Sequence, residues 1–250
     1  MLAEILRSTE ARIQALPVLS DVPDCGEHRS LKAAIRGARD RNAVIAELKY
    51  ASPSRGVIRT APAPTVLARD LVDGGCVAVS VITEPRYFGG NPVSIMEVRN
   101  AVGVPVLRKD FIIDERQLQE SKMLGADAVL LIASVLQERL GAFVRESRRL
   151  GLEPLVETHT PEEIRSAHQA GADIIGINNR DLRTMKVNLA TTVELSEAAR
   201  RSPALIVSES GLAWPCDIRM LRRYCDAFLI GSAITASRNP KKTLEGFVFA

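Results

Sequence analysis

Eight short apolar runs, each followed by a segment of helical periodicity, repeat from residue 43 to the end of the chain. The apolar runs span 43–50, 76–83, 104–109, 128–133, 154–158, 174–178, 204–209 and 227–231. The helical segments span 63–73, 93–101, 114–124, 136–149, 161–170, 189–200, 215–223 and 240–248. Strict alternation favours right-handed crossovers and a parallel sheet. Because the count is eight and no G-x-G-x-x-G follows the first run, the pattern predicts a closed (β/α)8 barrel, the α/β fold called a TIM barrel.

Two further helical segments precede the first strand and have no strand partner. Apolar residues recur at helical spacing within residues 1–16 and 29–40. We therefore predict a single domain over 1–250, in which a helical extension at 1–42 covers part of one end of a barrel formed by 43–250.

Length and composition exclude several classes of protein. The 250 residues, 46% of them hydrophobic, can bury one substantial core. No apolar run of roughly 18 residues or more is present, and acids and bases stand where a signal peptide would be apolar, so we predict a cytoplasmic protein. The net charge of +3 is mild and the bases are spread out, which argues against nucleic acid and favours a small anionic substrate.

Cysteine and histidine spacing gives no sign of a metal site. The four cysteines form no C-x-x-C pair, and His28, His159 and His168 form no motif with metal-ligand spacing. We therefore predict that the protein uses no metal and no cofactor.

The first apolar run contains two charges. Glu47 and Lys49 are two residues apart and share one face of a strand that is apolar on both faces, the pattern of a buried parallel strand. Buried charges are costly unless they pair or serve a ligand, so these two form either a structural ion pair or part of a site.

Polar residues gather where the apolar runs end. In a barrel of this kind, catalytic groups lie at the C-terminal ends of the strands and in the loops that follow. The strand ends provide Glu47, Lys49, Ser52, Lys109, Glu157, His159, Asn178, Arg180, Glu209, Ser210, Gly211, Gly231 and Ser232. So many polar residues at one end indicate a site.

Two of these strand ends have the pattern of a phosphate site. Residues 207–211 and 229–234 each end a strand with small residues, which lets backbone N–H groups approach an anion at the start of a short helix. Tight turns alone would need the same glycines, but the two loops occur together after strands 7 and 8, where barrels bind phosphate.

Together the strand-end motifs resemble indole-3-glycerol-phosphate synthase of tryptophan biosynthesis. The resemblance covers residue 43 to the end and rests on seven motifs in order, at 45–54, 83–90, 107–111, 155–159, 176–182, 208–211 and 231–232. It implies a carbon–carbon lyase, a carboxy-lyase, that converts 1-(2-carboxyphenylamino)-1-deoxyribulose 5-phosphate to indole-3-glycerol phosphate with loss of CO2 and water.

The resemblance also implies roles for individual residues. Lys109 is the general acid of ring closure, Lys49 meets the substrate carboxylate, and Glu157 stabilises the cationic intermediate and acts as a base. Glu47, Asn178 and Glu209 orient Lys49 and the sugar hydroxyls. The phosphate would be held by Ser52, Ser210, Gly211, Gly231 and Ser232.

The residue types suit this chemistry. A desolvated lysine in positively crowded surroundings has a lowered pKa and can give up a proton near neutrality, which arginine cannot do. Apolar walls for an aromatic ring are available in Phe88, Phe111, Leu131 and Leu182. Arg180 either meets the substrate carboxylate or pairs with Glu157 or Glu209. We interpret His159 as a hydrogen-bonded structural residue and leave it outside the catalytic set.

Two other functions use the same barrel and phosphate site. A sugar-phosphate isomerase would need an Asp and Cys pair at strand ends, and none of the four cysteines is at a strand end. A catalytically silent barrel that binds a phosphorylated ligand would keep the last two loops and lose the lysines, whereas this chain keeps both. We expect a monomer or a weak homo-oligomer.

Overall fold

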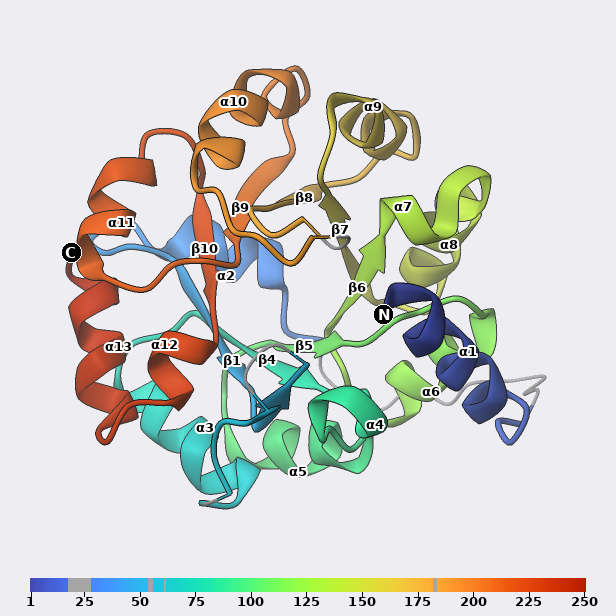
Figure 1. The fold of residues 1–250 in the computed structure, drawn as a ribbon, viewed down its shortest axis with the longest axis horizontal. Helices are drawn as coiled ribbons and strands as arrows, with labels where there is room; N and C mark the ends of the chain where they lie inside the picture. Colours follow the sequence, from blue (N-terminus) through green and yellow to red (C-terminus); the bar gives the residue numbers. More distant parts are fainter. Residues whose placement is uncertain (18–27, 54–55, 61, 182–183) are drawn as a thin grey trace.

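The fold is the predicted (β/α)8 barrel. The computed structural model describes residues 1–17, 28–53, 56–60, 62–181 and 184–250. Eight parallel strands close on themselves in the order β1-β10-β9-β8-β7-β6-β5-β4, and helices surround them (Figure 1). The strands are β1 (Val44–Leu48), β4 (Ala78–Ile82), β5 (Val106–Lys109), β6 (Ala128–Ile132), β7 (Glu153–Thr158), β8 (Ile174–Asn178), β9 (Leu205–Glu209) and β10 (Ala227–Ile230).

The outer helices follow the strands in sequence. They are α3 (Pro64–Asp73), α5 (Val93–Ala101), α6 (Glu115–Met123), α8 (Leu140–Arg149), α9 (Pro161–Gln169), α10 (Ala190–Ala199), α11 (Pro215–Leu221) and α13 (Pro240–Val248). Shorter elements occupy the loops, namely the hairpin of β2 (Ala51–Ser52) and β3 (Gly56–Val57), α4 (Pro85–Phe88), α7 (Ala133–Leu136) and α12 (Ser232–Thr235). The helix expected over 136–149 is interrupted by the 3-10 turn η1 (Gln137–Arg139), because Gln137 has a φ of 50°, outside the helical region.

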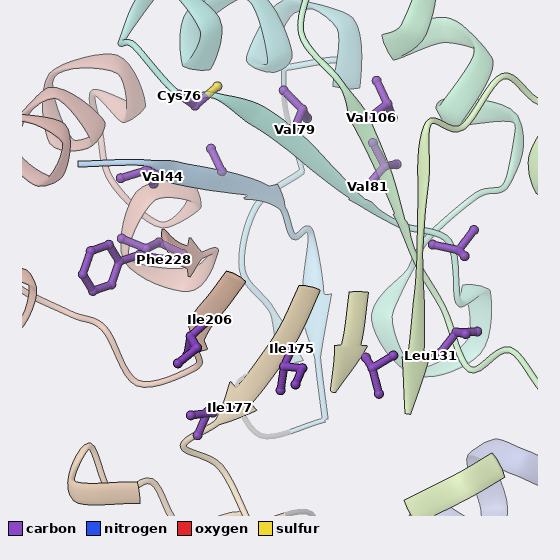
Figure 2. Close-up of a cluster of buried hydrophobic side chains, with 14 of the residues drawn as sticks. Val44, Cys76, Val79, Val81, Val106, Leu131, Ile175, Ile177, Ile206 and Phe228 are labelled. Carbon is purple, nitrogen blue, oxygen red and sulfur yellow. The ribbon is translucent and has the colours of Figure 1, made fainter. Parts of the chain in front are cut away.

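Alternation along each strand produces two separate cores. Residues that point outward pack beneath the helices, as Figure 2 shows for Val44, Val79 and Ile175. Residues that point inward, such as Ile45 and Leu107, fill the barrel. Parallel strands covered on both faces are apolar on both faces, which is why the apolar runs are nearly continuous in sequence.

The two N-terminal helices lie at opposite ends of the barrel. Helix α1 (Leu2–Ile13) lies at the C-terminal ends of the strands, where its Ile5 reaches the main cavity. Helix α2 (Leu31–Gly37) packs with the interior core through the fully buried Leu31. The extension therefore covers parts of both ends of the barrel and not of one end alone, with α1 at the strand ends and α2 at the strand starts.

Polar contacts explain the position of α2 at the strand starts. Ser30 donates a hydrogen bond of 2.6 Å to Glu153, the first residue of β7. Lys32 pairs at 2.6 Å with Asp173, directly before β8. Glu153 and Asp173, at the starts of β7 and β8, thus hold the first turn of α2 at this end of the barrel through Ser30 and Lys32.

Substitution of Leu31 tests whether α2 closes the barrel at the starts of the strands. Because its side chain is fully buried, Leu31→Ala leaves a cavity, and we expect the free energy of unfolding to fall by about 2–5 kcal/mol. Urea unfolding followed by circular dichroism measures the change. Met220→Ala, at an exposed side chain of α11, is the control, and equal losses in the two variants would contradict the placement of Leu31.

Candidate active site

A cavity of about 720 Å³ opens at the C-terminal ends of the strands, the usual place for a barrel active site. Its lining includes residues that the sequence predicts, namely Glu47, Lys49, Ser52, Phe88, Lys109, Phe111, Glu157, Asn178, Arg180, Glu209, Ser210, Gly211, Gly231 and Ser232. Leu182 lies outside the described residues. The barrel therefore brings together strand ends that are far apart in sequence.

Leu131 is a correction to the predicted lining. Its side chain packs in the outer core beneath the helices (Figure 2), whereas its neighbours Leu130 and Ile132 line the cavity. Successive side chains on a strand point to opposite faces, so the expected position was off by one residue. Leu130 and Ile132 supply the apolar wall that was assigned to Leu131.

Lys109 lies at the centre of the site between two buried carboxylates. It ends β5, and its Nζ is 3.1 Å from an oxygen of Glu157 on β7 and 3.1 Å from an oxygen of Glu209 on β9. The carboxylates are 3% and 1% exposed and are almost fully desolvated, whereas the Lys109 side chain is 18% exposed. Lys109, Glu157 and Glu209 each point into the barrel at the end of a strand. Closure of the barrel therefore brings the three side chains into contact.

The surroundings of Lys109 are negative, which corrects the expected direction of its pKa. Burial lowers the pKa of Lys109, but the carboxylates of Glu209, Glu157 and Glu47 raise it more, so the net shift is upward. The expectation of a positively crowded lysine is wrong here. Lys109 keeps its proton in the free enzyme.

The two carboxylates beside Lys109 differ in their affinity for a proton. Burial raises the pKa of Glu157, but Lys109, His159 and a hydrogen bond from Asn178 outweigh it, so the net shift is downward. Burial, only partly opposed by Lys109, raises the pKa of Glu209 to about 7. One carboxylate is thus held ionised, while the other can exchange a proton near neutrality.

A second charged pair comes from the first strand. Lys49 Nζ is 3.5 Å from Glu47 Oε1 and 5.7 Å from the centre of the Phe88 ring. Glu47 Oε2 and Glu209 Oε1 are buried without a hydrogen-bond partner. Unpaired buried acceptors are costly, and these two belong to residues that line the cavity, so they are available to donors on a ligand. In the described part of the chain, no group of three or more His, Cys, Asp or Glu side chains is arranged to hold a metal ion.

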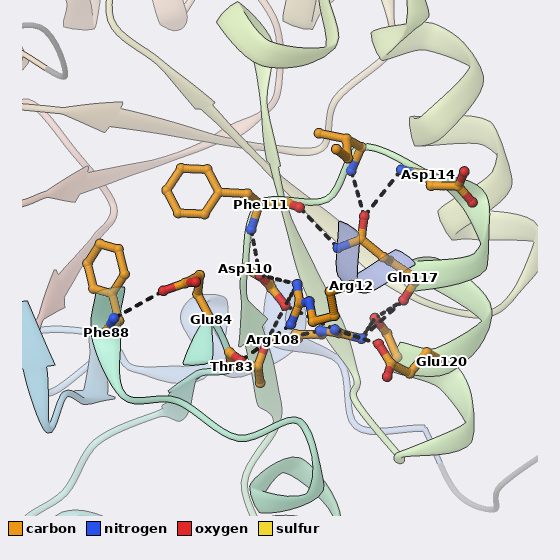
Figure 3. Close-up of polar contacts among 12 residues, drawn as sticks. Arg12, Thr83, Glu84, Phe88, Arg108, Asp110, Phe111, Asp114, Gln117 and Glu120 are labelled. Carbon is orange, nitrogen blue, oxygen red and sulfur yellow. Dashed lines mark hydrogen bonds and ion pairs between the residues drawn. The ribbon is translucent and has the colours of Figure 1, made fainter. Parts of the chain in front are cut away.

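Two phenylalanines form one side of the cavity. The rings of Phe88 and Phe111 have centroids 6.2 Å apart and a 40° tilt. Glu84 fixes the short helix that carries Phe88, because its carboxylate accepts hydrogen bonds from the N–H groups of Arg86, Tyr87 and Phe88. Figure 3 shows the last of these three bonds. This arrangement offers an apolar, aromatic surface beside Lys49.

The two small-residue loops line the same cavity. Ser210 and Gly211 both have positive φ, 65° and 83°, which turns the chain sharply after β9. Helix α12 begins at Ser232, and the first N–H groups of a helix have no acceptor within it. Gly231 has a further role, because a Cβ there would come within 2.5 Å of Glu47 Oε1. Glycine at this position gives room to a catalytic candidate.

Arg180 lines the cavity, whereas His159 is outside its lining and contacts Glu157. The backbone N–H of His159 donates to Glu163 at 2.7 Å, and its ring nitrogens lie 3.3 Å from Glu163 and 3.5 Å from Glu157. The Arg180 guanidinium donates to the carbonyl of Met185 at 2.9 Å, while Glu157 and Glu209 are held by Lys109.

Several residues that line the cavity are not predicted as site residues from the sequence. They are Met1, then Leu2 and Ile5 of α1, and Glu84, Met185, Trp214 and Lys242. An apolar residue on a surface helix carries no functional signal, so α1 could not be assigned. Lys242 had a weak signal, because lysine is scarce in this chain and residue 242 follows the last predicted loop.

Comparison with known proteins decides the family. The family model described as indole-3-glycerol phosphate synthase matches residues 3–247. The chain belongs to the indole-3-glycerol phosphate synthase family. Proteins of that name from Carboxydothermus hydrogenoformans (43% identity over 220 residues, 86% of this chain and 83% of the relative) and Methanopyrus kandleri (38% over 250 residues, 99% and 97%) are similar to it.

Solved structures support the fold. Tryptophan synthase from M. tuberculosis in its ligand-free form has a TM-score of 0.66 at 15% identity, over 88% of this chain and 97% of that chain. The 3-hexulose-6-phosphate synthase from Salmonella typhimurium has a TM-score of 0.66 at 17% identity, over 82% and 96%.

Membership of the indole-3-glycerol phosphate synthase family confirms the resemblance drawn from the motifs. The protein is an enzyme, a carboxy-lyase of tryptophan biosynthesis that acts on a small phosphorylated substrate. The alternatives, a sugar-phosphate isomerase and a catalytically silent barrel, are not favoured.

Gly231→Ala tests whether this glycine makes room for Glu47. A methyl group there displaces the carboxylate, and we expect kcat/KM to fall roughly ten- to a hundredfold, as for small misplacements of catalytic groups. Steady-state kinetics measures the loss. Gly37→Ala is the control, because a Cβ there has nothing within 4 Å. In a Glu47→Ala background, Gly231→Ala should have little further effect, and a full additional loss would contradict the interpretation.

The raised pKa of Glu209 predicts a pH dependence of stability. The folded protein binds this proton more tightly than the unfolded chain, whose carboxyl has the ordinary value of 4.5. The stabilising contribution is therefore complete below about pH 4.5 and is lost as the pH rises through about 7. Relative to Glu209→Gln, the parent should lose free energy of unfolding between pH 5 and 8. Urea unfolding at several pH values measures this, and a constant difference would disprove it.

Proposed function

We propose that ring closure takes place between Lys109 and the two phenylalanines, with Lys109 as the general acid at the ketone oxygen. The observation that supports this role is the 3.1 Å contact of its ammonium group with both Glu157 and Glu209 inside the cavity. The ketone oxygen becomes an alkoxide as the ring carbon attacks. An alkoxide is a far stronger base than either carboxylate, so a lysine with a raised pKa can still protonate it.

Lys49 is proposed to bind the substrate carboxylate. Its position over Phe88 puts a cation beside the surface on which the carboxyphenyl ring would lie. Glu47, 3.5 Å away, orients the ammonium group. Loss of CO2 removes this negative charge from the ring and restores its aromaticity after closure.

The carboxylates serve the cationic intermediate and the dehydration. Glu157, held ionised, stabilises the positive charge that spreads from the substrate nitrogen after closure. It then removes a proton from the ring carbon, while the hydroxyl takes a proton from Lys49 and leaves as water. Asn178 hydrogen-bonds Glu157 and keeps it in place. Glu209, with a pKa near 7, can exchange a proton with a sugar hydroxyl.

The phosphate is proposed to bind across the loops that follow β9 and β10. Backbone N–H groups near Gly211 and at the start of α12, together with the hydroxyls of Ser52, Ser210 and Ser232, offer donors to an anion. Lys242, at the rim of the cavity, adds positive charge. Arg180 is a further candidate for the substrate carboxylate.

Composition and charge are the basis for the cellular location and assembly state proposed here. Among the helices that the structure describes, none is long and apolar enough to cross a bilayer. We propose a cytoplasmic enzyme, monomeric or weakly homo-oligomeric, without a nucleic-acid partner and without a cofactor.

The two lysines test the proposal through their different roles. Lys109 acts mainly in the transition state, so Lys109→Met should lower kcat by roughly 10² to 10⁴ with a modest change in KM. Lys49→Met should impair both parameters, because the carboxylate is charged already in the free substrate. The assay follows indole fluorescence as the purified protein turns over the carboxyphenylamino sugar phosphate, with a chelator present.

Lys32→Met is the matched control for the lysine variants. It removes an ammonium group from the opposite end of the barrel, where Lys32 pairs with Asp173, and should leave kcat unchanged. Circular dichroism checks folding. A Lys109→Met enzyme that keeps more than about a tenth of the parental kcat would refute the role of Lys109 as the acid.

A further inference from the structure

A buried charge cluster lies behind Lys109, on the outer side of β5. Arg108 alternates with Lys109 along the strand, so its side chain points toward the helices, where it is fully buried. Its guanidinium is 3.0 Å from Asp110 Oδ2 and 2.6 Å from Glu120 Oε2 (Figure 3). Thr83 donates a further hydrogen bond of 2.7 Å to Asp110.

The barrel by itself leaves this cluster one positive charge short. Arg108 contributes one cation, which is shared between the fully buried Asp110 and the partly exposed Glu120, and a buried carboxylate with only part of a counter-charge is unfavourable. Arg12 of α1 supplies the missing cation. Its Nη2 donates to both oxygens of Asp110, at 2.9 and 2.8 Å, and its Nη1 lies 3.5 Å from the carbonyl oxygen of Thr83.

The same helix carries apolar residues to the cavity. Ile5 and Arg12 are seven residues apart, about two turns, so they lie on one face of α1. Ile5, together with Met1 and Leu2, lines the cavity, while Arg12 in the last turn contacts the barrel. The ion pair holds the last turn of α1 against the barrel, and the first turn of the same helix lies over the site.

Asp110 connects this helix to the catalytic segment. It stands between Lys109 and Phe111 in the chain, and its Oδ1 accepts a hydrogen bond of 2.9 Å from the Phe111 N–H. The Asp110 carboxylate thus contacts both Arg12 of α1 and the backbone of Phe111, which lines the cavity. Burial raises the pKa of Asp110, but Arg108 and Arg12 outweigh it and the net shift is downward, so the carboxylate stays charged.

We propose that Arg12 is a positioning residue for substrate binding: by pairing with Asp110, it holds the apolar start of α1 over the aromatic end of the cavity. The inference rests on the proposed function, since it takes Phe111 and Lys109 to face the substrate. Lys109 is also held by Glu157 and Glu209, so loss of Arg12 should weaken binding more than it slows the chemical step.

Kinetics of Arg12 variants test this role. Arg12→Met should raise KM roughly tenfold or more while kcat changes less than about threefold, and Arg12→Lys should restore much of the lost affinity. Arg7→Met is the matched control, because Arg7 is exposed on the same helix and donates to the carbonyl of Ala3 within it. Asp110 keeps Arg108 and Thr83 in the variant, so the protein should fold. An unchanged KM in Arg12→Met would overturn the proposal.

A double-mutant cycle separates positioning from a merely structural role. If Arg12 acts through Ile5, Ile5→Ala should raise KM in the parent and have little effect in Arg12→Met, whereas additive effects would refute the proposal. Hydrogen exchange gives a readout that does not need activity. Amides of α1 should exchange faster in Arg12→Met while those of α2 do not change, and equal protection of α1 would contradict the inference even if the proposed function fails.

Discussion

The ammonium group of Lys109 is the interaction on which the site depends. It neutralises two carboxylates that closure of the barrel forces together, Glu157 and Glu209. Without that cation, two buried like charges would repel one another, and the ends of β7 and β9 would carry uncompensated charge. Lys109 therefore holds Glu157 and Glu209 in place, and they hold Lys109. The same ammonium group stabilises the strand ends and takes part in the proposed chemistry.

Stability comes from other parts of the same molecule. The starts of the strands are filled by apolar side chains and closed by α2, with Leu31 fully buried in the interior core. The ends of the strands hold buried charges, including two carboxylate oxygens without partners, on Glu47 and Glu209. The apolar core at the strand starts thus offsets the loss of folding free energy caused by buried charges and unpaired carboxylate oxygens in the cavity.

Much of the site was predictable because strand ends in a parallel barrel all meet at one end. Lys49, Lys109 and Glu157 could be placed in the cavity from sequence alone on that ground. The direction of Leu131 could not be predicted, because a continuous apolar run does not show which of its residues point into the barrel. A shift of one residue moves a side chain to the other face of the strand. The direction of the Lys109 pKa shift is likewise not predictable from the sequence, since it depends on which charges the other strands bring near.

The sequence by itself determined the barrel, since eight apolar runs alternating with helical segments admit few other arrangements, and it determined which residue types stand at the strand ends. Only the tertiary structure decided which of them touch. Gly231 and Glu47 are neighbours because β10 pairs with β1 when the barrel closes. Helices α1 and α2 lie at opposite ends because different polar contacts hold them there: Arg12 pairs with the buried Asp110 at one end, and Ser30 donates to the partly exposed Glu153 at the other. Local periodicity encodes secondary structure, whereas such pairings depend on contacts between residues far apart in the chain.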